Sequence, residues 1–559
     1  MAPKLILGPL LRHVGFSDAT LWVETDAPCE VGVFVGDESH RSHTFAVEGH
    51  HYALVLITDL EPGSAHEYAV ELDGERVWPE EGDPLPPSVI RTIVPDDRLT
   101  LAFGSCRVSV PHEPPYTEKR GVIMRGGVSG KRFSRDALYA LALRMHRQPS
   151  EEWPDALLLL GDQIYADDIS MGTREFIRSR RDTSQPPGEE VADFEEYTRL
   201  YWDAWKNPVI RWLLSTVPSA MIFDDHDVHD DWNTSEAWVR QMRSKPWWEE
   251  RIVGAFMSYW IYQHLGNLSP QELKEDDLFR RVREAKDATR TLREFAHEAD
   301  REVAGSRWSF HRDFGNVRLI MIDSRAGRVL DEDKRSMLDP EEWAWIEEKA
   351  TGDFDHLLFG TSLPFLLSPG LHHLEAWNEA VCRGAWGPLA ARLGESIRQA
   401  LDLEHWSAFH SSFAGLTRLL RAVGAGERSN SHPPASMVIL SGDVHHGYLV
   451  ETDLGEGLES AVYQAVCSPL RNPLGIPERL ALRAGWTKMG ERIGKTLARL
   501  ARVEEPRVRW RLTHKEPWFS NHVGTLELRG REATLRVEET APEDGREPRL
   551  YTVLEHRLA

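Results

Sequence analysis

The sequence contains 559 residues, of which 41% are hydrophobic and 28% are charged, as in ordinary soluble globular proteins. This length exceeds what one hydrophobic core supports, so we expect two or three domains. The net charge of −23 argues against a nucleic-acid backbone as partner, because such binding needs a surplus of Lys and Arg.

Cysteines and apolar segments indicate the compartment. The four cysteines are far apart and form no CxxC pair, so neither a disulfide framework nor a zinc ribbon is indicated. The first residues lack the long apolar segment of a signal peptide and carry no twin-arginine pair. No apolar stretch reaches the roughly 20 residues of a membrane span. We therefore expect a cytoplasmic protein.

Residues 1–96 alternate between apolar and polar side chains in short segments such as ATLWVET and CEVGVFVG, which Asp, Gly and Pro turns separate. This period predicts half-buried strands. The segment LEPGSAHEYAVEL resembles the corner of fibronectin type III modules. The sequence therefore predicts an N-terminal β-sandwich that is fibronectin III-like, followed by a Pro-rich boundary.

From about residue 98 the apolar residues form short continuous runs, among them LTLAFG, ALLLL, AMIF, VRLIMI and MVIL. Continuous runs are typical of strands covered on both faces, so residues 97–505 are predicted to form a layered α/β catalytic domain. The charged, Trp-rich part at about 170–310 has helical periodicity and is expected to be a helical insertion. Residues 506–559 return to strands and are expected to form a C-terminal β segment packed on the catalytic domain.

Side chains able to bind metals or substrates follow five of these runs. They are Cys106, Asp162, Asp225, Asp323 and Asp443. Ligands of open α/β sheets bind beyond the carboxyl ends of strands. One such ending could be an ordinary Asp or Ser turn, but the whole series favours a common site.

The motif GDQIY places Asp162 and Tyr165 after a buried run. Asp162 could bridge two ions, and a phenol binds well to a strongly acidic ion such as ferric iron. Alone, the motif would indicate a strand-end turn with a packed Tyr. Cys106 would alone indicate a small core residue, but its position after a strand allows a thiolate on the same ion as Tyr165.

The motif FDDHDVHDDWN crowds seven ionisable side chains into eight positions. It could be a solvated acidic loop, but Phe223 and Trp232 beside it favour partial burial. We expect Asp225 to bind a metal and His226 to protonate a leaving group. In SGDVHH, the spacing of two directs Asp443 and His445 to the same side, toward the metals.

Three further residues are predicted to contact the substrate: Arg107, Arg325 and His446. Arg325 is a candidate phosphate clamp, since guanidinium matches phosphate oxygens, and an ion pair with Asp323 is the equal alternative.

The motifs FGSC, GDQIY, DDHD and SGDVHH together resemble the alkaline phosphatase D (PhoD-like) family, distant relatives of purple acid phosphatases among the calcineurin-like metallophosphoesterases. The resemblance implies a four-layer α/β/β/α core and hydrolysis of phosphomonoesters or phosphodiesters. It implies Fe3+ bound by Cys106, Asp162, Tyr165 and His445, and Ca2+ bound by Asp162, Asp225 and Asp443. Where many members have Asn, this sequence has Asp230 and Asp231.

A dinuclear site of this kind predicts a phosphoric ester hydrolase that attacks small-molecule phosphoesters with a metal-activated water, with Asp162 and His226 as catalytic residues. Two alternatives stay open. One is a zinc or manganese (Zn2+ or Mn2+) phosphodiesterase acting on nucleotides or lipid headgroups. The other is a binding protein that keeps the fold without the metals.

Residues 482–502 carry apolar side chains at helical spacing with basic residues beside them. Such a helix could lie on an anionic membrane. Because most amphipathic helices are simply half-buried, we expect it to pack on the catalytic domain.

Overall fold

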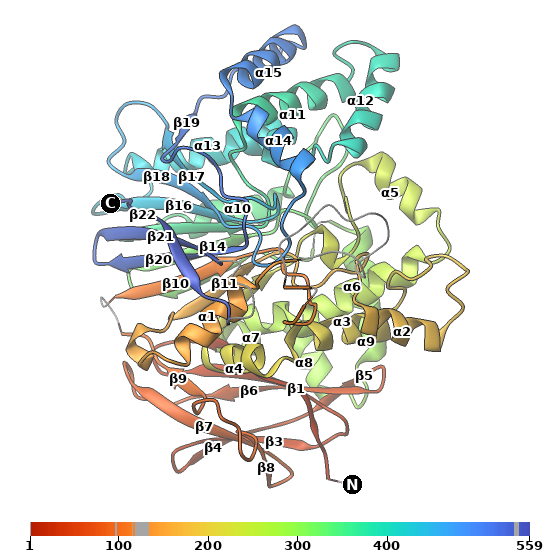
Figure 1. Ribbon diagram of the computed structural model, residues 1–559, viewed down its shortest axis with the longest axis vertical. Coiled ribbons are helices and arrows are strands. Elements are labelled where there is room, and N and C mark those ends of the chain that lie inside the picture. The colour runs from red at the N-terminus through yellow and green to blue at the C-terminus, as the bar shows by residue number, and fades with distance from the viewer. Residues whose placement is uncertain (1, 95–97, 115, 118–132, 304, 541–546) are drawn as a thin grey trace.

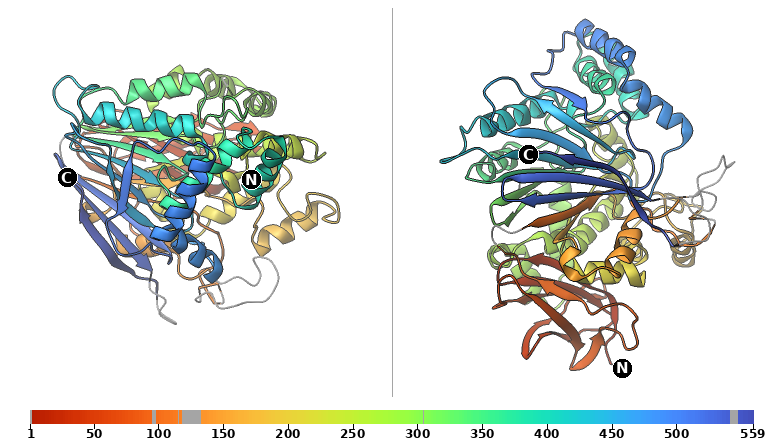
Figure 2. Two further views of the ribbon diagram at one scale, coloured as in Figure 1. Left: turned by 90° about the horizontal axis from the view of Figure 1, so that it is seen from above. Right: turned by 60° about the vertical axis from the view of Figure 1, so that its left-hand side comes forward.

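The computed structural model describes residues 2–94, 98–114, 116–117, 133–303, 305–540 and 547–559. It contains an N-terminal β-sandwich, two larger sheets, and helices on both outer sides of those sheets (Figure 1). The sandwich forms one end of the molecule and the helices α14 and α15 form the other (Figures 1 and 2).

The sandwich consists of two antiparallel sheets. One has the order β1 (Leu5–Val14), β2 (Ala19–Thr25), β6 (His50–Ile57) and β5 (Phe45–Val47). The other has the order β4 (Glu38–His43), β3 (Glu30–Val35), β7 (Ala65–Leu72) and β8 (Glu75–Trp78), and β9 (Val89–Arg91) also pairs with β7. Side chains that alternate along these strands, such as Val31 and Val33 of β3, fill a core of their own. The predicted β-sandwich is confirmed.

The first large sheet has six strands. Their order is β12 (Ser219–Ile222), β11 (Ala156–Leu160), β10 (Leu99–Gly104), β20 (His522–Arg529), β21 (Glu532–Thr540) and β22 (Leu550–Arg557). The strands β10, β11 and β12 run parallel, and β20 joins β10 antiparallel. The C-terminal strands β20, β21 and β22 therefore form half of this sheet.

The second large sheet has seven strands. Their order is β13 (Phe310–Phe314), β14 (Val317–Ile322), β15 (His356–Thr361), β16 (Ser436–Ser441), β18 (Ala461–Val466), β17 (Tyr448–Asp453) and β19 (Arg509–Leu512). Its four central strands β14, β15, β16 and β18 run parallel. All of the continuous apolar runs predicted as buried strands lie in these two sheets.

The two sheets pack face to face, as one strand illustrates. Leu319 and Met321 of β14 belong to the core shared with the six-stranded sheet. Ile320 and Ile322, which point the opposite way, belong to the core under the helices on the outer face. Helices thus cover the outside of both sheets, and the predicted four-layer α/β/β/α core is confirmed (Figure 2).

Fifteen helices lie among the described residues. Those before β13 are α1 (Ala137–Met145), α2 (Met171–Arg180), α3 (Phe194–Trp205), α4 (Pro208–Thr216), α5 (Glu236–Arg243), α6 (Trp248–Tyr262), α7 (Pro270–Glu275), α8 (Asp277–Glu284) and α9 (Thr289–Arg301). Those after it are α10 (Pro340–Lys349), α11 (Pro369–Cys382), α12 (Pro388–Ala400), α13 (His410–Gly424), α14 (Ile476–Gly485) and α15 (Lys488–Leu500). The predicted helical insertion corresponds to α2–α9, which the core strand β12 divides in two.

The sandwich is joined to this helical region by buried polar contacts. The Arg12 guanidinium is fully buried and donates to the carbonyl oxygens of Tyr262 and Gln263 at 2.6 and 2.7 Å. The Tyr68 hydroxyl donates to the carbonyl oxygen of Ser215 at 2.6 Å. The segment that resembles a fibronectin corner therefore uses its Tyr to attach the sandwich to α4. None of the described helices is long and apolar enough to cross a membrane.

Candidate metal centre

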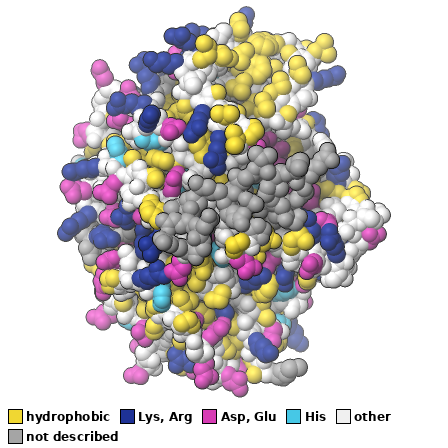
Figure 3. Space-filling model, in the orientation of Figure 1, with side chains coloured by type: hydrophobic (Ala, Val, Ile, Leu, Met, Phe, Trp, Pro, Cys, Tyr) yellow, Lys and Arg dark blue, Asp and Glu magenta, His cyan; other side chains and the backbone are white. Residues whose placement is uncertain are grey.

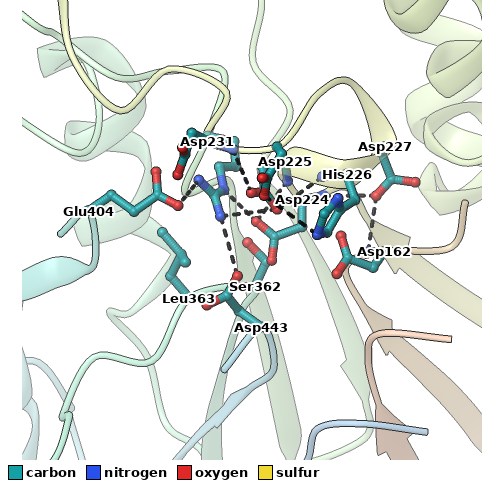
Figure 4. Close-up of polar contacts among 12 residues, drawn as sticks. Asp162, Asp224, Asp225, His226, Asp227, Asp231, Ser362, Leu363, Glu404 and Asp443 are labelled. Carbon is teal, nitrogen blue, oxygen red and sulfur yellow. Dashed lines mark hydrogen bonds and ion pairs between the residues drawn. The ribbon is translucent and has the colours of Figure 1, made fainter. Parts of the chain in front are cut away.

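The predicted metal ligands converge at the carboxyl ends of the parallel strands of both sheets. Cys106 follows β10, Asp162 follows β11, Asp225 follows β12, and Asp443 and His445 follow β16. Carboxylates from three of these strand ends point toward one another in Figure 4. Side chains separated by more than three hundred positions in the sequence thus share one site.

One cluster within this site contains a thiol, a carboxylate and an imidazole. Ligand atoms of Cys106, Asp162 and His445 all lie within 4.8 Å of one another. The Tyr165 hydroxyl lies beside them, 3.2 Å from Oδ2 of Asp162. The structure therefore brings together the four residues predicted to hold the first cation.

A second cluster consists of carboxylates. Oxygen atoms of Asp224, Asp225 and Asp443 lie within 4.8 Å of one another, and Asp162 also lies within that distance of Asp225. Asp162 therefore belongs to the first cluster and lies beside Asp225 of the second, where a bridging ligand would be.

The backbone around these side chains is unusual. Cys106, Asp162, Asp443 and His445 have φ values of 54°, 52°, 64° and 50°, in the left-handed region. Non-glycine residues in that region cost of order 1–3 kcal/mol each and concentrate at functional sites. Gly161, with φ 107°, turns the chain directly before Asp162, and a Cβ there would lie 2.7 Å from Cβ of Asp224.

The charge balance of the site without a cation is unfavourable. The pKa of Cys106 is raised well above its ordinary value by burial and by the carboxylates of Asp162 and Asp443. The pKa of Asp162 is also raised well above its ordinary value, first by burial and then by the surrounding Asp residues, although His226 lowers it. A bound cation reverses these effects, because it favours the deprotonated thiol and carboxylate.

Two observations show that these residues fit metal ions. Oδ1 of Asp162 is buried and accepts no hydrogen bond from the part of the chain that the structure describes. A buried carboxylate oxygen without a partner is costly unless a cation coordinates it. The donor set, with a thiol, a phenol, an imidazole and several carboxylates, is also one that binds transition metals and hard cations.

Arg325 occupies a different place from the one predicted. Its side chain is fully buried, and among the residues that the structure describes its guanidinium contacts carboxylates only: it pairs with Asp224, lies 2.6 Å from Glu404 and 3.3 Å from Asp443. These contacts leave no exposed donor for a phosphate. The structure favours a role in positioning the carboxylates over the predicted phosphate clamp. The predicted pair with Asp323 is not formed by the side chain either, since Asp323 accepts from the backbone N–H groups of residues 325–327.

The other two residues predicted to contact substrate are also buried. Arg107 donates to Asp136 at 2.9 Å and to the carbonyl oxygen of Ala204 at 2.9 Å. Nδ1 of His446 lies 2.7 Å from the carbonyl oxygen of Val444, and its ring stacks on Phe519. These contacts favour structural roles for both side chains.

His226 lies at the edge of the metal centre, where its side chain is 21% exposed. Its Nδ1 is 2.9 Å from Oδ1 of Asp167. Burial alone would lower the pKa of His226, but Asp167 and Asp225 raise it well above its ordinary value. Asp167 therefore holds the ring in one orientation and favours its protonated form.

Several supporting residues escaped the sequence analysis. Nε2 of His405 lies 3.1 Å from Oδ2 of Asp443, and its Nδ1 lies 2.7 Å from Glu375. Oδ2 of Asp227 accepts from the backbone N–H groups of Asp162 and Asp224, at 3.0 and 2.9 Å. Asp227 lies in the acidic motif FDDHDVHDDWN, but no role was predicted for it. His405 follows no apolar run, so nothing in its sequence surroundings indicated a role.

Comparisons with known proteins agree with this geometry. A family model described as PhoD-like phosphatase matches residues 126–510, more than half of the chain. The chain belongs to the PhoD-like phosphatase family. Membership supports a metal-dependent phosphoester hydrolase as its general class. A second family model, a domain of unknown function (DUF7800), matches residues 2–90.

The fold of this PhoD-like chain is also found in a solved structure. The structure of PhoD aligns with a TM-score of 0.60 at 12% identity, covering 100% of this chain and 92% of that one. Purple acid phosphatase PPD1 from yellow lupin (Lupinus luteus) seeds gives a TM-score of 0.46 at 10% identity, covering 99% of this chain and 74% of that one. No curated protein matches the chain.

Proposed function

We propose that this PhoD-like chain hydrolyses small-molecule phosphoesters at a dinuclear metal centre. The observation that carries the proposal is the convergence of two ligand clusters, with Asp162 a member of the first and within 4.8 Å of Asp225 in the second. The first cation would be held by Cys106, Asp162, Tyr165 and His445. The second would be held by Asp162, Asp225 and Asp443.

The donors suggest which cations these are. A phenol and a thiol near one carboxylate suit Fe3+, which is acidic enough to bind a phenolate. The carboxylates of the second cluster suit a hard cation such as Ca2+. Asp231 lies beside that cluster: its backbone N–H donates to Asp225 at 3.0 Å, and burial together with Asp402 and Glu404 raises its pKa to about 9. A cation bound nearby would favour its deprotonated form.

When bound, two such cations lower the pKa of a coordinated water and neutralise the charge of the phosphate. The residues of this chain supply the rest. Arg325 and His405 hold the Asp443 carboxylate from two sides, at 3.3 and 3.1 Å. Asp167 engages Nδ1 of His226, so Nε2 is the ring nitrogen that can give a proton to the leaving oxygen.

A substrate panel with and without chelator tests the proposal. The full-length protein should hydrolyse p-nitrophenyl phosphate or bis(p-nitrophenyl) phosphate, lose this activity on dialysis against a chelator, and regain it when metal is restored. Hydrolysis that persists after the metals have been removed would contradict the proposal. So would a metal-loaded protein that binds phosphoesters without cleaving them.

The identity of the first cation can be tested by its colour. Tyrosinate bound to Fe3+ gives a visible charge-transfer band, and Tyr165→Phe should remove it while leaving the fold intact. A colourless, fully active protein that contains only zinc or manganese would contradict the proposed iron.

A further inference from the structure

The end of the molecule opposite the sandwich carries an unusual concentration of exposed apolar side chains. Among the described residues, fourteen large hydrophobic side chains are exposed, and nine of them lie on or beside α12, α14 and α15: Trp386, Leu389, Leu393, Leu401, Ile476, Leu480, Met489, Ile493 and Leu500. Figure 3 shows hydrophobic side chains gathered at this end, with Lys and Arg side chains beside them. We call these residues and their basic neighbours the helical end surface.

The way in which α15 packs explains this exposure. Its buried residues are small: Gly494 and Ala498 face α11, and a Cβ on Gly494 would lie 2.6 Å from the carbonyl oxygen of Gly370. Its large apolar residues point outward, with Met489 64%, Ile493 55% and Leu500 63% exposed. The helix therefore packs on α11 through these small residues and the half-buried Leu497.

The neighbouring helix α12 extends the same surface. The Trp386 indole, beside the start of α12, donates to the carbonyl oxygen of Leu500 at the end of α15, at 3.2 Å. Ala390 and Ile397 of α12 pack against the same small core as Leu497 and Ala498 of α15. Leu389 and Leu393, exposed by 80% and 64%, therefore continue the apolar side chains of α15.

The charge of this surface is opposite to that of the whole chain. Residues 476–502 contain seven basic and two acidic side chains, a net charge of +5 in a chain of −23. Lys488 and Arg492 of α15 flank Met489 and Ile493, and neither forms an ion pair with another residue in the described parts of the chain. Because charges are screened beyond about 8–10 Å at physiological salt, this local excess decides what approaches the surface.

We infer that the helical end surface binds the surface of an anionic lipid bilayer. An apolar face edged by Lys and Arg is the arrangement by which helices lie in the interface of such a membrane. A second copy of the chain is a less favourable partner for this surface. A symmetric pair would place Lys488 and Arg492 of one copy close to those of the other, and these like charges repel. This inference does not depend on the hydrolase activity.

Co-sedimentation of the full-length protein with vesicles tests the inference. The protein should bind vesicles of equal parts phosphatidylcholine and phosphatidylglycerol at least about tenfold more tightly than phosphatidylcholine alone. Raising the salt from about 0.1 M to about 1 M should weaken this binding, since the screening length falls from about 10 Å to about 3 Å.

Two double variants separate the apolar and the charged contributions. I493Q with L500Q should weaken binding to the mixed vesicles by at least about tenfold. K488E with R492E should weaken binding to a similar degree and abolish the preference for anionic lipid. Two changes at exposed residues elsewhere serve as controls. One is V553Q on β22, where the Val is 39% exposed, and the other is K286E. Both variants should bind vesicles as the wild type does.

Hydrolysis of a soluble aryl phosphate should be the same in all of these proteins, because none of the changes touches the metal centre. The inference is overturned if the wild type binds neither kind of vesicle, or if both double variants bind as the wild type does. It is also overturned if the protein sediments as a dimer that I493Q with L500Q converts to a monomer without any effect on lipid binding.

Discussion

Asp162 belongs to the cluster of Cys106 and His445 and lies within 4.8 Å of Asp225 in the carboxylate cluster, which makes it the residue that links the two. Its Oδ2 lies 3.2 Å from the Tyr165 hydroxyl, and its Oδ1 accepts no hydrogen bond from the described residues. The backbone N–H of Asp162 is in turn held by Asp227 at 3.0 Å. The side chain is thus oriented by its neighbours while one oxygen is left for a cation.

Asp162→Asn should lower kcat by at least about 1,000-fold and remove most of the bound metal. The fold should be retained, because the change removes one negative charge from a crowd of buried carboxylates. The melting temperature of the metal-free protein should stay within about 5 °C of that of the wild type or rise. A variant that keeps its full metal content and activity would contradict this role.

His226→Ala should slow hydrolysis most for substrates with poor leaving groups. A general acid contributes about 100- to 10,000-fold, and it matters least when the departing group is already stable as an anion. An alkyl phosphate compared with p-nitrophenyl phosphate measures the difference. Equal losses of activity for both substrates would contradict the proposed role of His226 as proton donor.

Among individual residues, the sequence indicates the ligands that directly follow strands. It does not indicate the residues that hold those ligands in place. Cys106 and Asp443 were predictable because each ends an apolar run. The burial of Arg325 among carboxylates was not, since a guanidinium after a strand fits a phosphate as well as it fits an Asp. Whether Arg325 binds a carboxylate or a phosphate depends on the position of Glu404. The sequence around Glu404 contains no motif that predicts this contact.

The turn after β11 shows how an element places the site. Gly161 has φ 107° and lies so close to the end of β12 that an added Cβ would be 2.7 Å from Cβ of Asp224. Only a residue without a side chain allows the two strand ends to bring Asp162 and Asp224 together.

Gly161→Ala should lower the free energy of unfolding by about 3 kcal/mol or more, from backbone strain and from the clash. Gly188→Ala is a matched control, because Gly188 also has positive φ but a Cβ there meets nothing within 4 Å. The control should cost about 1 kcal/mol. Urea unfolding of both variants measures this, and equal costs would show that the close approach is unimportant.

Apolar runs predicted the strands well, because strands buried on both faces need continuous hydrophobic residues. They could not predict which sheet each strand joins. The strand β20 lies beside β10, more than four hundred positions away in the sequence, and GTLELRG carries no sign of that partner. The predicted domain limits at residues 96 and 505 stay a prediction.

Across the whole molecule, ionisable contacts join the sandwich to the helical region. His50 of β6 lies between Glu24 of the sandwich and Glu195 of α3, at 2.9 and 2.7 Å. Burial alone would lower the pKa of His50, but the hydrogen bonds to Glu195 and Glu24 raise it to about 9. Because the folded pKa lies above the unfolded value of about 6.5, this stabilisation is complete below pH 6.5 and is lost as the pH rises through 9.

The wild type should therefore lose about 1–3 kcal/mol of stability between pH 7 and pH 10 relative to His50→Gln, which lacks the titrating group. Urea unfolding at the two pH values measures the difference between the proteins. A difference that does not change with pH would show that His50 is neutral in the folded protein.

The most direct test of the dinuclear centre is a crystal structure of the metal-loaded protein with anomalous diffraction. Two anomalous peaks are expected roughly 3.5–4 Å apart, with Asp162 between them and Cys106, Tyr165 and His445 around one of the two. A single peak, or peaks remote from Asp162, would contradict the proposed dinuclear centre.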